Sequence, residues 1–227
     1  LIIGSELNVF REFKNIQLTL SAINLKKFLL FNFTPSPNTL FSEVRKVSNA
    51  ELVEIRLDTL YTTRNKYYTY EKSPTSCKNS GEAIEVLDFM IGKSVKERLI
   101  TDDEIGVLLS GGIDSTLISI YAKEISDKLV TFTAGIKEKT FDETDKAAHV
   151  AAFLGLENYN TTISNSNFAN YLTEISNKID DPIGATSLVP TYAVSKLAAK
   201  TVKSVIGGDG GDEIFGGFEL FRFTKLF

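Results

Sequence analysis

Apolar and polar positions follow two different patterns along the chain. From residue 82 onward, short apolar runs alternate with segments in which apolar residues recur every three or four positions. The first pattern is typical of buried strands and the second of amphipathic helices. The expected strands are residues 105–109, 129–134, 159–163 and 202–206, and the expected helices are 84–99, 116–122, 147–154, 172–179 and 187–200. Strands that alternate with helices predict an α/β fold with a doubly wound parallel sheet, which binds ligands at the carboxyl ends of its strands.

Residues 1–72 have a weaker pattern. They are expected to contain a strand end, a short helix, a turn-prone connector and a half-exposed strand, at residues 1–3, 25–30, 34–38 and 52–57. The connector holds two prolines, which remove backbone donors and keep the preceding residue out of the helical region. A polar linker follows at about residues 71–81, so we expect two domains, at residues 1–72 and 82–227.

The first candidate site is a glycine-rich turn, Ser110-Gly111-Gly112-Ile113-Asp114-Ser115, between the strand 105–109 and the helix after it. Such a turn directs backbone N–H groups and the positive end of the helix dipole at one spot, which suits a phosphate chain. Its serines add hydroxyl donors, and Asp114 can hold a magnesium ion that the phosphates also contact. No Lys-Ser or Lys-Thr pair closes the turn, so it is not a Walker loop. An ordinary strand–helix turn is the alternative interpretation.

A second glycine-rich segment follows the expected strand 202–206. Residues 207–218 hold six glycines and three acidic residues. Glycine loses more conformational freedom on folding than any other residue, so this composition is costly for a solvated turn alone. It suits a loop whose backbone approaches a nucleotide while its acidic side chains hold magnesium or assist a proton acceptor.

SGGIDS at residues 110–115, followed by GDGGDEIFGGF at residues 208–218, resembles the synthetase domain of glutamine-hydrolysing asparagine synthetases. Further matching segments lie at 141–143, 181–187 and 190–192, and residues 4–7 and 31–41 resemble the end of the glutaminase domain and its connector. The resemblance implies an adenine nucleotide alpha-hydrolase-like, ATP pyrophosphatase fold for residues 82–227. For residues 1–72 it implies the C-terminal remnant of an N-terminal-nucleophile glutaminase domain, with the connector.

The resemblance also assigns roles to single residues. Leu108 and Ala134 would contact the adenine or the ribose. The ATP phosphates would lie against residues of the first loop, namely Ser110, Gly111, Gly112, Asp114 and Ser115, and the backbone of Gly207 and Gly208 in the second loop would touch the nucleotide. Asp114 and Asp212 would hold the magnesium ion, and Asp209 matches the acid near the reacting carboxylate. Asp114, Asp209 and Asp212 are therefore the expected catalytic residues.

The implied reaction converts aspartate to asparagine with ATP and Mg²⁺. The side-chain carboxylate of aspartate would attack the α-phosphate and form a β-aspartyl-adenylate with loss of pyrophosphate, and ammonia from glutamine would then displace AMP. Two alternatives stay open. One is the same adenylation of another carboxylate, as in a β-lactam synthetase-like or a glycan- or peptide-associated amidotransferase, and the other is an ATP-binding module without catalysis.

Three further segments are candidates for the substrate side of such a site. Residues 184–187, Gly-Ala-Thr-Ser, would decide substrate contacts. Asp180 and Asp181 would either line an aspartate pocket or end a helix. Asp142 and Glu143 would either start the following helix or face the substrate.

Composition narrows the partners and the location. The 25 basic and 29 acidic residues give a net charge of −4 without a long basic run, so nucleic acid is not expected as a partner. No apolar run reaches the roughly 18 residues of a membrane span. Cys77 is the single cysteine, which allows no intrachain disulfide and favours the cytoplasm. The expected partners are small molecules (ATP, aspartate, and glutamine or ammonia), with a homodimer as an option.

Both ends of the sequence lie in apolar-rich stretches, at residues 1–3 and 218–227, so we interpret the chain as an internal fragment. The family's N-terminal cysteine nucleophile and a lysine that neutralises pyrophosphate would lie outside it, since Cys77 and Lys225 do not match them. The fragment alone is therefore expected to be inactive.

Overall fold

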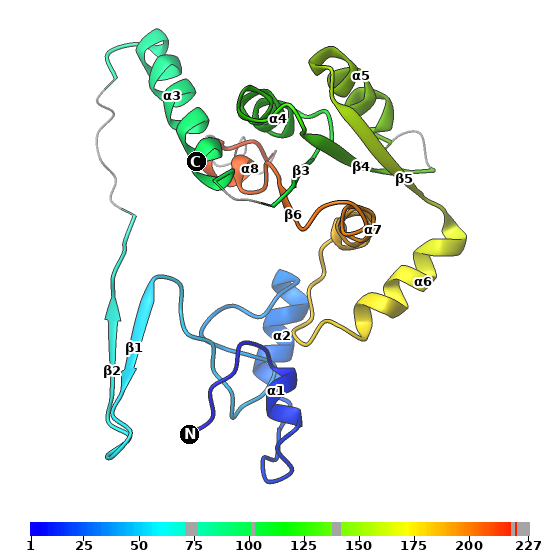
Figure 1. Ribbon diagram of the computed structural model, residues 1–227. Helices are drawn as coiled ribbons and strands as arrows, with labels where there is room; N and C mark the ends of the chain where they lie inside the picture. Colours follow the sequence, from blue (N-terminus) through cyan, green and yellow to red (C-terminus); the bar gives the residue numbers. More distant parts are fainter. Residues whose placement is uncertain (71–76, 101–102, 138–141, 219–220, 222–227) are drawn as a thin grey trace. The chain divides into compact units, whose positions relative to one another are not determined.

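The computed structural model describes the chain except for residues 71–76, 101–102, 138–141, 219–220 and 222–227 (Figure 1). Phe141 and most of the expected linker and of the C-terminal stretch lie outside the described residues. The chain forms two compact units, Leu1–Pro74 with Leu172–Leu188 and Thr75–Tyr171 with Val189–Phe227. The domains expected at 1–72 and 82–227 stay a prediction.

The second unit contains a four-stranded parallel sheet with the strand order β5-β4-β3-β6. Its strands are β3 (Ile105–Leu108), β4 (Val130–Ile136), β5 (Glu157–Ile163) and β6 (Ser204–Ile206). All four expected strands are confirmed within a few residues, since each of them forms a strand of this sheet. The strand order reverses at β3, because β4 and β5 follow on one side of it and β6 lies on the other.

Helices cover both faces of this sheet, as Figure 1 shows for α4 and α5 on one face and α7 on the other. The helices of this unit are α3 (Ser80–Arg98), α4 (Ile113–Ile125), α5 (Thr144–Leu154), α7 (Leu188–Ala198, with Leu188 in the first unit) and α8 (Gly211–Phe215). On the first face, Val107 of β3 packs with Ala122 of α4 and Ala147 of α5. On the second face, Phe132 of β4 is fully buried with Val194 of α7. The predicted doubly wound arrangement is therefore confirmed.

Helix α6 (Asn165–Ser176) begins seven residues before the expected helix 172–179. The reason is a pair of reciprocal hydrogen bonds at its start. Ser164 N donates to Asn167 Oδ1 over 2.7 Å, and Asn167 N donates to Ser164 Oγ over 3.4 Å. These bonds satisfy backbone donors at the helix end, and they fix the start upstream of the apolar positions on which the prediction rested.

The N-terminal part of the first unit, as far as the structure describes it, contains helices and a hairpin. They are α1 (Asn8–Arg11), α2 (Ala22–Phe31) and the antiparallel pair β1 (Glu51–Ile55) and β2 (Thr62–Lys66). The expected helix 25–30 and the strand 52–57 are confirmed within a few residues, as α2 and β1. The strand end expected at residues 1–3 is wrong, because no described segment pairs with these residues. An extended apolar segment becomes a strand only when another backbone supplies its hydrogen bonds.

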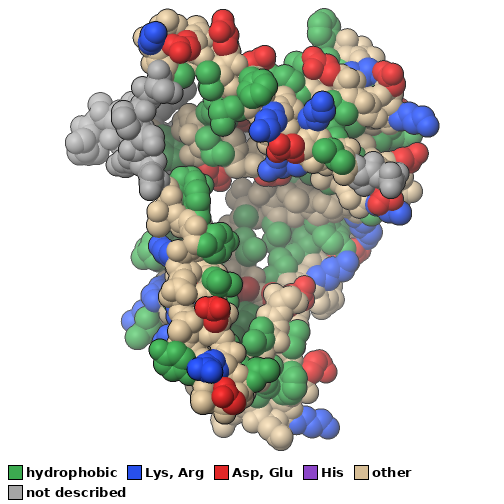
Figure 2. All heavy atoms as spheres, turned by 60° about the vertical axis from the view of Figure 1, so that its left-hand side comes forward, with side chains coloured by type: hydrophobic (Ala, Val, Ile, Leu, Met, Phe, Trp, Pro, Cys, Tyr) green, Lys and Arg blue, Asp and Glu red, His purple; other side chains and the backbone are tan. Residues whose placement is uncertain are grey.

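Charge is mixed on the surface. Figure 2 shows Lys and Arg side chains interspersed with Asp and Glu over the visible face. Large apolar side chains also stay exposed, for example Phe89 of α3 and Leu57 beyond β1. Among the described helices, none combines the length and the apolar content that a membrane crossing requires. Surface charge alone therefore singles out no binding face in this view, and the candidate site is located by the loops at the end of the sheet.

Candidate active site

The two glycine-rich loops meet at one edge of the sheet in the second unit. Strands β3 and β6 are parallel neighbours, with Val107 opposite Ile206. The segments that follow them, 109–112 and 207–210, therefore leave the sheet at the same edge. This edge lies where the strand order reverses, which is the position at which open α/β sheets bind ligands.

The loops are in direct contact. A Cβ atom added at Gly208 would lie 2.7 Å from Asp114 Cβ and 3.0 Å from Ser115 N. One added at Gly211 would lie 2.7 Å from Asp114 Oδ1. Only glycine therefore lets the second loop approach the first turn of α4 this closely. The contact brings Asp114 against the start of α8, which carries Asp212.

The first loop is shaped by its two serines. Ser110 N donates to Ser115 Oγ over 3.2 Å, Gly112 N donates to Ser110 Oγ over 3.2 Å, and the two hydroxyl oxygens lie 3.0 Å apart. Ser115 is buried. Both hydroxyls therefore hold the loop itself, a role that the sequence prediction of phosphate donors did not include.

The start of α4 offers its backbone donors to a ligand. Gly112 is the N-cap of this 13-residue helix, and no side chain makes a capping hydrogen bond there. The first N–H groups of a helix have no partner within the helix, and the helix dipole adds positive potential at the same end. Such an end binds anions such as phosphate.

Gly111 is the residue at which the first loop packs against α5. Its φ of +79° lies in the region that favours glycine, and an added Cβ would lie 2.7 Å from Lys146 Cβ and 2.8 Å from Ala147 N. The loop is thus packed against the first turn of α5, so its shape depends on the sheet's neighbouring helix as well as on its own residues.

Replacing Gly111 by alanine is expected to lower the free energy of unfolding by about 2–5 kcal/mol, because a positive φ and an overlap with α5 add together. Gly155→Ala is the matched control, since Gly155 has a φ of +65° and no atom within 4 Å of the added Cβ. There we expect only the conformational cost of about 1–2 kcal/mol. Urea unfolding of both variants measures the difference, and equal losses would contradict the close packing.

Leu108 and Ala134 lie on the face of the sheet that α7 covers, where both are partly buried against the cluster of Phe132. The ends of their strands are tied together, because Leu109 N donates to Phe132 O over 2.9 Å and Thr133 Oγ1 donates to Leu109 O over 2.8 Å. The predicted adenine or ribose contact of Leu108 and Ala134 stays a prediction.

The three expected catalytic carboxylates differ in exposure. Asp114 and Asp212 are half-buried, whereas Asp209 is exposed and its Oδ2 lies beside Gly207. Within the described ranges, no three His, Cys, Asp or Glu side chains form a group that could hold a metal ion. The carboxylates present suit a magnesium ion that is shared between one or two of them and the phosphates of a bound nucleotide. Magnesium is usually bound in this way in ATP-dependent enzymes.

Asp142 stabilises the start of α5. The hydroxyl of Thr144 donates to Asp142 Oδ1 over 2.6 Å and the Thr144 N–H over 3.1 Å. These two hydrogen bonds lower the pKa of Asp142, with the hydroxyl as the larger cause. The geometry supports the helix-start alternative for this residue.

Asp180 and Asp181 make contacts that the sequence prediction missed. Asp180 Oδ2 accepts hydrogen bonds from Leu7 N and Asn8 N at the start of α1, and Asp181 forms an ion pair with Lys46. Both carboxylates are therefore bound to residues of the first unit that lie far away in the sequence. No local pattern could have indicated these partners.

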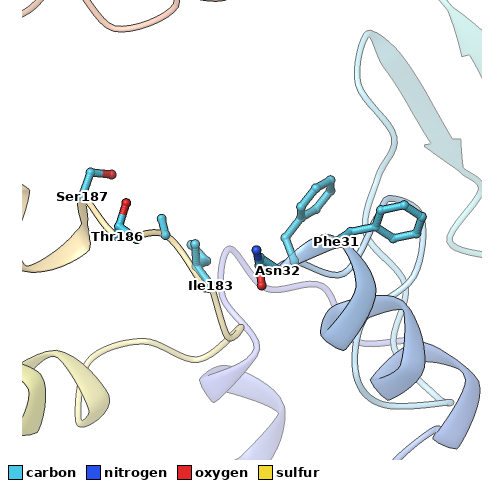
Figure 3. Close-up of a pocket in the computed structure, with 8 residues that line it drawn as sticks. Phe31, Asn32, Ile183, Thr186 and Ser187 are labelled. Atoms are coloured by element: carbon cyan, nitrogen blue, oxygen red, sulfur yellow. The ribbon is translucent and has the colours of Figure 1, made fainter. Parts of the chain in front are cut away.

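A pocket of about 530 Å³ lies on the first unit. Residues 31–33, at the end of α2, and residues 183–187 line it (Figure 3). The pocket thus includes the Gly-Ala-Thr-Ser segment singled out from the sequence, whereas the aromatic side chains of Phe31 and Phe33 were not expected there.

The chain is similar to known proteins. The model of the family described as "Asparagine synthase" matches residues 87–227. "Asparagine synthetase [glutamine-hydrolyzing] 1" of Bacillus subtilis is 36% identical over 198 residues, which is 87% of this chain and 31% of that protein. "Putative asparagine synthetase [glutamine-hydrolyzing] 2" of Methanocaldococcus jannaschii is 30% identical and covers 95% of this chain and 43% of that protein. The chain therefore spans less than half the length of these curated relatives.

Among solved structures, the ammonia-dependent NAD synthetase of Campylobacter jejuni is similar to 62% of this chain and 61% of its own, with a TM-score of 0.40 and 19% sequence identity.

Proposed function

The chain belongs to the asparagine synthase family, and on that premise we propose that the full-length protein is an ATP-dependent amidotransferase that converts aspartate to asparagine. The observation that supports this most directly is the contact between the two loops. Gly208 and Gly211 press against Asp114, so the helix start and the carboxylates that the reaction needs lie together at one edge of the sheet.

The proposed mechanism begins with the phosphates of ATP at the start of α4. The N–H groups of this helix start and of the glycines would donate hydrogen bonds to the negatively charged phosphate oxygens. These donors are already oriented before the substrate binds. Asp114 and Asp212 would hold a magnesium ion, which when bound offsets the charge of the pyrophosphate. Leu108 and Ala134 are proposed to contact the adenine or the ribose.

Two bond exchanges follow in this proposal. An oxygen of the aspartate side chain forms a bond to the α-phosphorus while the bond between the α-phosphorus and the bridging oxygen breaks, so pyrophosphate leaves and a β-aspartyl-adenylate remains. Ammonia then attacks the acyl carbon, and AMP leaves with the electrons of the broken C–O bond. Asp209 is proposed to lie near the reacting carboxylate, where its charge favours loss of a proton from the attacking nitrogen.

The full-length protein is proposed to contain a second active site. Residues 1–72 are proposed to be the C-terminal remnant of a glutaminase domain whose cysteine releases ammonia from glutamine. The reaction consumes ATP and free amino acids, which favours the cytoplasm, and a homodimer is the proposed assembly. Both features rest on the family membership and not on a contact within this chain.

Pyrophosphate release by the full-length protein tests the proposed function. With ATP and Mg²⁺ present, we expect release when aspartate is added and only a background rate when it is withheld. Glutamate and other carboxylates serve as competing acceptors in parallel reactions. ATP binding without aspartate-dependent release of pyrophosphate would contradict the assignment. If only another carboxylate caused release, that carboxylate would be the substrate of the same adenylation reaction.

A further inference from the structure

Three contacts tie the segment 180–184 to the N-terminal residues of the first unit. Asp180 accepts from the backbone at the start of α1, Asp181 pairs with Lys46, and Gly184 N donates to Asn32 O over 2.7 Å. Each contact joins residues more than a hundred positions apart, and all of them lie inside one compact unit. The position of residues 180–184 is therefore fixed by contacts with N-terminal residues of the unit and not by local secondary structure.

Lys46 is the central member of this set. Its ammonium group donates to Thr34 O over 3.0 Å as well as to Asp181 Oδ2. The pair is only partly exposed to water, with 34% of the Lys46 and 20% of the Asp181 side chain accessible. Asp181 Oδ1 is buried and has no hydrogen-bond partner among the described residues. Removing Lys46 would leave a half-buried carboxylate without its compensating charge, which is costly.

The contact at Asn32 fixes the wall of the pocket on the first unit. Asn32 ends α2 with a φ of 63° and donates its N–H to Phe28 O. A Cβ atom added at Gly184 would lie 2.9 Å from both Asn32 Cβ and Asn32 Oδ1. Figure 3 shows Asn32 beside Ile183, with Thr186 and Ser187 farther along the same segment. The distance between α2 and this segment thus sets the width of the pocket.

We propose that Lys46 is a positioning residue for the acceptor substrate: by holding Asp181, it keeps residues 183–187 against α2 in the arrangement that binds the acceptor. This inference rests on the proposed function. The nucleotide loops belong to the second unit, so the loss of Lys46 changes acceptor binding and leaves ATP binding intact.

The test compares Lys46→Met, Lys46→Arg and the control Lys203→Met in the full-length protein. Lys203 forms an ion pair with Asp103 that is more exposed, with 77% and 45% of the side chains accessible. In Lys46→Met we expect the KM for aspartate to rise about tenfold, equivalent to about 1.4 kcal/mol, while the KM for ATP stays within about twofold. Lys46→Arg keeps the charge and should restore most of the aspartate affinity. Lys203→Met should change neither constant.

Hydrogen exchange of the peptide that contains Gly184 provides a readout that does not depend on activity. In Lys46→Met its exchange should be about tenfold faster, because the Gly184 N–H loses a fixed acceptor in Asn32 O. An unchanged exchange rate, or an equal rise of both KM values without rescue by arginine, would overturn the inference. If the unaltered protein releases no pyrophosphate with aspartate, the proposed function fails, and the exchange measurement alone decides whether Lys46 holds the segment.

Discussion

Asp114→Asn is expected to lower aspartate-dependent pyrophosphate release by the full-length protein by about a hundredfold or more. The substitution keeps the size of the side chain and removes its charge. Asp114 lies in the first turn of α4 and packs against Gly208 and Gly211 of the second loop. A neutral amide there would weaken the magnesium site at the point where charge on the leaving pyrophosphate must be offset.

Asp127→Asn is the matched control for this variant. Asp127 follows the other end of α4, and its side chain is 98% exposed. We expect its rate of pyrophosphate release to stay within about twofold of the unaltered protein, since exposed ion pairs contribute little. The rate of pyrophosphate release at several magnesium concentrations distinguishes weakened magnesium binding from unfolding of the variant. Equal activity of the two variants would contradict the role of Asp114.

Gly208→Ala is expected to lower the free energy of unfolding by about 1–3 kcal/mol and to weaken ATP binding by about tenfold or more, since the two loops must separate to fit the methyl group. The added Cβ would overlap Asp114 Cβ at 2.7 Å and Ser115 N at 3.0 Å, and the second of these is backbone. A backbone atom cannot swing away as the end of a flexible side chain can. The change therefore shifts the first turn of α4, which is the proposed phosphate site.

Urea unfolding and calorimetric titration with ATP measure both effects of Gly208→Ala. Gly81→Ala serves as the control, because Gly81 lies in the first turn of α3 and its added Cβ would approach only Asn79 Oδ1, at 3.2 Å. Alanine favours a helix more than glycine does, so this variant should be neutral or slightly more stable. If both variants lost the same stability, the contact between the loops would not be the cause.

The centre of the sheet was predictable from the sequence because β3 and β4 are largely buried. They contain the fully buried Val107 and Phe132. The meeting of the two loops was also predictable, since parallel strands end at the same edge. The start of α6 was not, because it depends on the bonds between Ser164 and Asn167 and not on apolar spacing.

The candidate site was predicted in part. Its position at the ends of β3 and β6 followed from the glycine-rich segments, but the internal hydrogen bonds of Ser110 and Ser115 did not. Periodicity reports which face of an element is buried, whereas a hydroxyl rotates toward whichever partner the folded loop supplies. The partners of Asp180 and Asp181 were also beyond prediction, since charge attraction between distant residues leaves no local pattern.

The division of the first unit between two stretches of sequence has a consequence for synthesis on the ribosome. Residues 1–74 emerge long before Leu172–Leu188, which contain the partners of Leu7, Asn32 and Lys46. A domain built from two distant stretches of sequence stays partly folded until the second stretch has been synthesised. During that time it is exposed to chaperones and proteases. The sheet of the second unit also depends on a late segment, because β6 is translated after the other three strands. Both units are therefore completed late, and a chain released before residue 188 would leave neither of them finished.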